Sequence, residues 1–324
     1  MDTKKFSMRY EIFLVILLAM MILFIGLVNP AFWSWGTLFD VIGIQTIYIL
    51  MAFGLLPVVI LGGVDISFVA IAALATYPVN HLMQKFGYTG GIWLYYVCGI
   101  TIGVLAGLLI AYLLTTFKLK IFDLSLGMNT LIYGFITFFV SSMTNSWTSP
   151  GTVDYNTKFI ITVQSVVGTS GLHVSFLTIV VTGILLHLLL KYTIIGRGIY
   201  AVGSDRSVAI RTGFNIRRIY MLVFPIMGAL AGIAGFTFSI LESMARPYLF
   251  MGKNMQVLAA VVLGGASTTG GKGTVIGTFL GALLIGLVNQ SLVYLGISTK
   301  WYDAVVGVIF IIYATFQSLT EQSR

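Results

Sequence analysis

Few side chains in this sequence could contact a polar solute, and most of those are uncharged. One acidic and one hydroxyl residue follow a pair of glycines in the stretch LGGVDIS, and two pairs of amides lie late in the chain. Amides both donate and accept hydrogen bonds, which suits a neutral, hydroxyl-rich solute better than an ion. The residues predicted to lie near such a solute are Asp65, Ser67, Asn254, Gln256, Asn289 and Gln290.

Each of these residues also has a structural interpretation. Gly62 and Gly63 can end one helix, and Asp65 or Ser67 can cap the next. In the alternative, the glycines break a helix whose irregular backbone lines a cavity, which is where membranes tolerate such backbone. The amides can instead join helices through hydrogen bonds, at about 0.6 kcal/mol per pair.

Several other chemistries lack the residues they need. The histidines are scattered, at positions 81, 173 and 187, so no metal site is expected. The single cysteine, Cys98, excludes an internal disulfide. The stretch GGASTTGGKGT departs from a phosphate-binding loop at Ala266 and Gly273, where that motif needs glycine and Ser or Thr. We therefore expect no catalytic residue, no metal and no cofactor.

Charge gathers in one stretch, GRGIYAVGSDRSVAIRTGFNIRR at 196–218, which holds five arginines and one aspartate. Gly203 and Gly213 bound the segment SDRSVAIRT, and the apolar spacing predicts a short amphipathic helix between two turns. Such a helix could lie on lipid through its arginines, or dock into a groove of a soluble partner through its small residues. The candidate contact residues are Arg197, Ala201, Gly203, Asp205, Arg206, Ala209 and Gly213.

The elements that must position these residues are membrane helices. The 324 residues are 58% hydrophobic and 9% charged, with a mean hydropathy of +1.00, whereas soluble domains are about a quarter charged. Spanning helices need about 20 apolar residues. The long uncharged stretches are 12–39, 41–64, 66–84, 86–117, 124–153, 159–190, 219–241, 254–271, 273–299 and 304–320. We predict an all-α polytopic bundle of about ten transmembrane helices. The stretch 254–271 either spans fully or is a broken or re-entrant helix.

Lysine and arginine placement predicts the orientation. With the N-terminus inside, ten spans place 13 of the 18 cations in cytoplasmic segments and return the C-terminus to the cytoplasm. The net charge of +8 then reflects loops that face anionic membrane lipid, and nucleic acid is not implied. Residues 1–324 form a single transmembrane domain, with 191–218 as its longest cytoplasmic segment.

Glycines at four-residue spacing predict close helix packing on shared faces. The sets are Gly103 with Gly107, Gly228 with Gly232, and Gly273 with Gly277 and Gly281.

Three blocks in this order resemble permeases of ribose-type ATP-binding-cassette sugar importers. They are LGGVDIS at 61–67, the arginine-rich stretch with Gly196-Arg197 and Tyr200-Ala201-Val202-Gly203, and LAAVVLGGASTTGGKGTVIGTFLGA at 258–282. With LVNQSLVYLGIS at 287–298, the resemblance covers the chain from residue 59 to its end. The sequence departs from the family at Asn254 and Gln256, where acidic residues are common, and at Asp205-Arg206-Ser207, where an acidic pair is frequent.

This resemblance implies a multi-pass subunit of the bacterial cytoplasmic membrane that imports a small neutral solute, a monosaccharide first, with nucleosides or furanone-type signals as alternatives within the family. It implies three partners: a second permease subunit, cytoplasmic ATP-binding subunits and an extracytoplasmic solute-binding protein. The segment 191–218 would then couple the ATPase to the spans, and the chain itself would not be an enzyme. The rival hypothesis is an ion-coupled or passive transporter that works without an ATPase.

Overall fold

The computed structural model describes residues 3–88, 90–139, 159–165, 168–242, 245, 248 and 250–322. Its elements follow in chain order: α1 (Thr3–Val28), η1 (Pro30–Trp33), α2 (Trp35–Ile60), α3 (Phe68–Lys85), α4 (Trp93–Phe117), α5 (Ile121–Phe139), β1 (Phe159–Ser165), β2 (Gly168–His173), α7 (Phe176–Tyr192), α8 (Ile194–Ser204), α9 (Arg206–Arg211), α10 (Ile216–Leu241), α11 (Asn254–Leu263), α12 (Val275–Tyr294), η2 (Thr299–Trp301) and α13 (Tyr302–Gln322).

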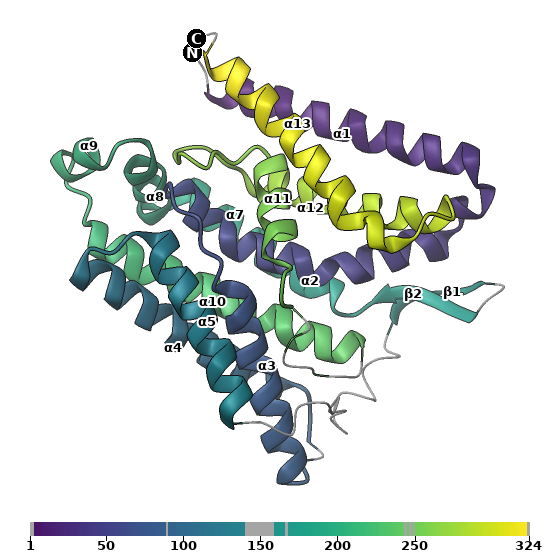
Figure 1. Cartoon of the computed structure of the whole chain (residues 1–324), viewed down its shortest axis with the longest axis horizontal. Helices are drawn as coiled ribbons and strands as arrows, with labels where there is room; N and C mark the ends of the chain where they lie inside the picture. Colours follow the sequence, from purple (N-terminus) through teal and green to yellow (C-terminus); the bar gives the residue numbers. More distant parts are fainter. Residues whose placement is uncertain are drawn as a thin grey trace.

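Helix α2 is the centre of the bundle. It packs against α10 and α3 on one side and against α12 and α11 on the other, and Figure 1 shows α3, α4, α5 and α10 separated by α2 from α1, α12 and α13. Helices α8 and α9 lie at one end of the molecule, and the β1–β2 hairpin lies towards the other (Figure 1). In the most hydrophobic part of α2, 78% of the residues are buried inside the protein. The helices that carry the candidate residues therefore converge on one central helix.

The described residues form an all-α polytopic membrane bundle, with one small hairpin. Six helices are long and apolar enough to cross a membrane, or seven if α7 and α8, which are bent by 72° at their junction, count as one span. One predicted span, 159–190, is wrong in extent. It begins with the two strands, and among its described residues only those of α7 are helical. Lack of charge does not by itself specify a helix, and the β-branched run Ile160-Ile161-Thr162-Val163 favours a strand.

The stretch 254–271 is not a continuous helix, so the full span is excluded among the forms predicted for it. Helix α11 ends at Leu263 and is 10 residues long, which is about 15 Å of helical rise and half of a hydrocarbon core. Gly265 stops it with a φ of +87°. Its N–H and that of Ala266 bond back to Val262 and Val261 at 2.8 and 3.2 Å, the pattern of a Schellman cap.

Helix α2 ends in the same way. Gly62 has a φ of +81°, and the N–H groups of Gly62 and Gly63 bond back to Val59 and Val58 at 2.9 and 3.2 Å. Two interior helices of the bundle thus stop at glycine caps, and each is followed by irregular backbone.

The predicted glycine faces hold helices together. A Cβ added at Gly103 would overlap the carbonyl oxygen of Gly228, and one at Gly228 would overlap that of Gly103, so α4 and α10 touch through their backbones. Gly277 and Gly281 likewise bring α12 against the end of α11, but Gly273, predicted on the same face, lies before α12 begins. Such contact allows the close approach on which membrane helices depend for van der Waals packing.

Candidate solute pathway and coupling segment

The carboxylate of Asp65 lies in the turn just before helix α3 and binds Ser67, the N-cap residue of that helix. Its side chain is 1% exposed, and Oδ1 accepts hydrogen bonds from the backbone N–H and the hydroxyl of Ser67, both at 2.6 Å. Asp65 thus fixes the turn that leads into α3, whose N-cap residue is Ser67. Its second oxygen, Oδ2, is buried and has no hydrogen-bond partner among the described residues.

Asn254, at the start of α11, contacts this segment. Its Nδ2 donates to the carbonyl oxygen of Ile66 at 3.3 Å. The fold therefore brings Asp65, Ser67 and Asn254 together, although 186 residues or more of sequence separate them.

Gln256 is engaged elsewhere. It is 5% exposed, and its Nε2 donates to Oδ1 of Asp303 at 2.7 Å, which joins α11 to the start of α13. This contact is a hydrogen bond between helices, the structural alternative given for the amides in the sequence analysis.

Asn289 and Gln290 lie in a different place, on α12 where it faces α2. With Gln45 and Gly286 they line a cavity of about 150 Å³, whose walls are completed by Val41, Ile44 and Val293. Gln45 was not among the predicted residues. It lies in a long apolar stretch as a lone amide, and only the packing of α2 on α12 places it beside the other two.

The arginine-rich stretch forms two short helices where one was predicted. Asp205 separates α8 from α9 in an extended conformation, and its Oδ1 accepts from the hydroxyl and N–H of Ser207 at 2.7 Å each and from Val208 N–H at 3.1 Å. These bonds, led by the one from the Ser207 hydroxyl, lower the pKa of the Asp205 carboxyl below its usual value. Asp205 is therefore a helix cap on the exposed surface.

The small residues of this stretch face the rest of the chain. A Cβ on Gly203 would overlap the carbonyl oxygen of Ile60 at the end of α2, and Ala209 is fully buried. The Gly271 N–H donates to the same Ile60 oxygen at 2.8 Å, and the Tyr200 hydroxyl donates to the Gly273 carbonyl at 2.7 Å. The end of α8 thus contacts the segments that follow both broken helices.

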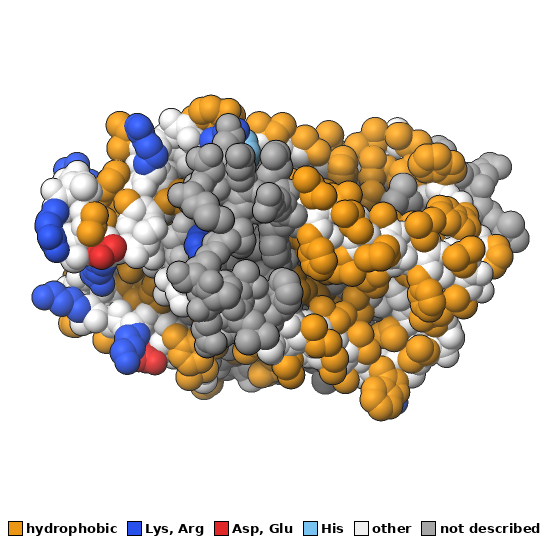
Figure 2. Space-filling model, turned by 90° about the horizontal axis from the view of Figure 1, so that it is seen from above, with side chains coloured by type: hydrophobic (Ala, Val, Ile, Leu, Met, Phe, Trp, Pro, Cys, Tyr) orange, Lys and Arg blue, Asp and Glu red, His pale blue; other side chains and the backbone are white. Residues whose placement is uncertain are grey.

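The outer surface of α8 and α9 is charged and partly apolar. Arg197, Asp205 and Arg206 are exposed, and Val208 and Ile210 are 49% and 58% exposed. Ala201 is half-buried, and Gly213 forms an exposed turn with a φ of +89°. Figure 2 shows blue Lys and Arg side chains gathered at this end of the molecule and many orange apolar side chains towards the opposite end.

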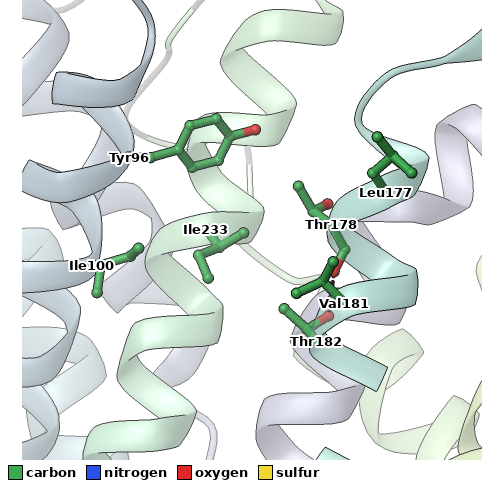
Figure 3. Close-up of a pocket in the computed structure, with 7 residues that line it drawn as sticks. All are labelled: Tyr96, Ile100, Leu177, Thr178, Val181, Thr182 and Ile233. Atoms are coloured by element: carbon green, nitrogen blue, oxygen red, sulfur yellow. Dashed lines mark hydrogen bonds between the residues drawn. The ribbon is translucent and has the colours of Figure 1, made fainter. Parts of the chain in front are cut away.

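A larger cavity, of about 290 Å³, lies between α7 and the pair α4 and α10. None of the predicted residues lines this cavity. Figure 3 shows the side chains that do: Tyr96, Ile100, Leu177, Thr178, Val181, Thr182 and Ile233. The hydroxyls of Thr178 and Thr182 bond to carbonyls of their own helix, so they offer little to a polar solute. Within the described ranges, no three His, Cys, Asp or Glu side chains are grouped to hold a metal ion.

A bundle of long apolar helices with an arginine-rich end defines a polytopic membrane protein. The chain belongs to the family described as "Branched-chain amino acid transport system / permease component", whose profile matches residues 37–314. Members are permease components of ATP-binding-cassette transporters and are not themselves enzymes.

Curated relatives align over most of their length. The ribose import permease protein RbsC of Bacillus subtilis (strain 168) is 27% identical over 91% of this chain and 88% of its own. RbsC of Escherichia coli (strain K12) is 25% identical over 95% and 93%. The autoinducer 2 import system permease protein LsrC of Enterobacter sp. (strain 638) is 30% identical over 87% and 79%. These matches confirm the resemblance to ribose-type permeases. No solved structure matches the chain.

Proposed function

We propose that this chain is the membrane-spanning subunit of an ATP-driven importer for a small neutral solute, a monosaccharide, in the bacterial cytoplasmic membrane. The relatives named as ribose import permeases support the solute class. The scarcity of buried charge supports it too. An importer that receives its solute from a binding protein needs little affinity of its own for that solute, so its pathway needs few charged groups. Both termini lie in the cytoplasm, and two such subunits, two ATP-binding subunits and a solute-binding protein complete the assembly.

The observation that carries this proposal is the position of α8 and α9. Their outer surface presents Val208 and Ile210 among arginines, and their inner surface touches Ile60 and the loop that follows α11. A segment that meets a partner on one side and both broken helices on the other can transmit movement between them.

The roles within the coupling segment divide by exposure. Arg206, Val208 and Ile210 contact the ATP-binding subunit, since they are exposed. Gly203 and Ala209, which the sequence assigned to the same contact, pass the movement inward through their packing on the chain itself. Asp205 keeps α8 and α9 at a fixed angle as their shared cap.

The test is reconstitution in liposomes with the ATP-binding and solute-binding subunits of the same importer. We expect ribose uptake that requires ATP and all partners. Ile210→Asp should weaken association with the ATP-binding subunit at least tenfold, or about 1.4 kcal/mol, and abolish uptake. The matched control is Leu119→Asp, because Leu119 is an exposed apolar residue of the α4–α5 connection. Uptake by the chain alone on an ion gradient would contradict the proposal in favour of the rival transporter.

A further inference from the structure

Gln45 is a buried amide that the fold leaves unsatisfied. It lies on α2, the central helix, and is 3% exposed. Its Oε1 has no hydrogen-bond partner among the described residues. An unpaired buried carbonyl oxygen is costly, and an apolar residue of similar size would pack there without that cost. Packing within the isolated chain therefore does not explain why position 45 carries an amide instead of an apolar side chain.

The neighbouring helix is shaped to accommodate this side chain. Gly286 on α12 lies so close to it that an added Cβ would overlap Cγ and Cδ of Gln45. Any larger residue at 286 would displace the amide from its place between α2 and α12. The absence of a side chain at this position thus holds Gln45 at the wall of the 150 Å³ cavity.

The cavity combines amides with apolar walls. One turn further along α12, Asn289 and Gln290 line it beside Gln45, and Val41, Ile44 and Val293 form the rest. The side chains of Asn289 and Gln290 make no hydrogen bond to another described residue. The volume corresponds to about five waters at roughly 30 Å³ each, and it is smaller than pockets that enclose a ligand, about 300 Å³ or more. It can therefore hold one face of a small solute.

We propose that Gln45, Asn289 and Gln290 form a hydrogen-bonding contact point for the hydroxyls of a neutral solute, with Gly286 as the residue that positions Gln45. This inference rests on the proposed function and adds a site to it. Amide oxygens accept from solute hydroxyls and amide N–H groups donate to them, while the valine and isoleucine walls meet the C–H groups. The site is separate from Asp65 and Asn254, which lie at the two broken helices.

The first experiment measures ribose uptake by the complete complex. Gln45→Leu should raise the KM for ribose or lower its transport rate about tenfold, because the solute loses its hydrogen bonds, while the protein unfolds no more easily. Gly286→Ala should have a similar effect on transport by displacing Gln45. The matched control is Gln84→Leu on α3, a second glutamine with an unpartnered buried oxygen that lies outside the cavity. Unchanged kinetics in Gln45→Leu would overturn the contact point.

The second experiment does not depend on transport. In a Cys98→Ser background, the variants Gln45→Cys and Asn289→Cys should react with a water-soluble maleimide, and ribose should slow that reaction at least threefold. Failure of both cysteines to react would show that the cavity is sealed, and reaction at a rate that ribose does not alter would show that ribose does not bind there; either result overturns the inference. Absence of ribose uptake by the wild-type complex would instead contradict the proposed sugar function. In that case the maleimide reaction and its protection by ribose would test the contact point without transport data.

Discussion

At the scale of single residues, the contact of Gly203 with α2 has no room for a side chain. A Cβ there would overlap the Ile60 carbonyl oxygen and lie 2.7 Å from the Gly271 nitrogen. We expect Gly203→Ala to lower the free energy of unfolding by about 1–3 kcal/mol, the usual cost of overpacking. Gly134→Ala is the matched control, because Gly134 is also helical and has open space around it. That control should be neutral or stabilising by up to about 1 kcal/mol. Equal shifts in the thermal unfolding of the two purified variants would refute this account of Gly203.

At the scale of elements, the short helix α11 depends on side-chain bonds near its start. Gln256 donates to Asp303 of α13 and is nearly buried. We expect Gln256→Ala to cost about 1 kcal/mol of stability, since Asp303 is exposed and solvent screens the bond, and to leave transport per folded molecule unchanged. A double-mutant cycle with Asp303→Ala measures the coupling by chemical unfolding. If stability stays constant and specific transport falls, Gln256 belongs to the pathway after all.

At the scale of the whole molecule, the distribution of cations predicts that α8 and α9 face the cytoplasm. Ser207 on α9 and Ser298 after α12 are both exposed, and the topology predicted from charge places them on opposite sides of the membrane. In a Cys98→Ser background, a membrane-impermeant maleimide added to spheroplasts should label Ser298→Cys and leave Ser207→Cys unlabelled until the membrane is opened. Labelling with the opposite sidedness would reverse the orientation, and with it the assignment of α8 and α9 to the ATP-binding subunit.

The sequence by itself determined the features that depend on neighbouring residues. Uncharged stretches located most of the helices, Gly62 and Gly63 marked the end of α2, and the Asp-Ile-Ser pattern marked the start of α3. These features are local, since a helix cap or an apolar run needs only a few consecutive residues. Four-residue glycine spacing also identified the helix faces that meet between α4 and α10.

Only the tertiary structure decided which distant residues meet. Asn254 bonds to the Ile66 carbonyl beside Asp65, and Asn289 and Gln290 line a cavity with Gln45 of α2. Helix rotation, which brings these residues together, is set by packing partners and not by composition. Gly203 and Ala209 turned inward for the same reason. The extent of the spans around 159–190 and 254–271 also required the fold, since a strand and a broken helix can be as free of charge as an intact one. Hydrophobicity determines that a segment lies in the membrane or the protein core, but long-range backbone contacts determine which helices lie next to it.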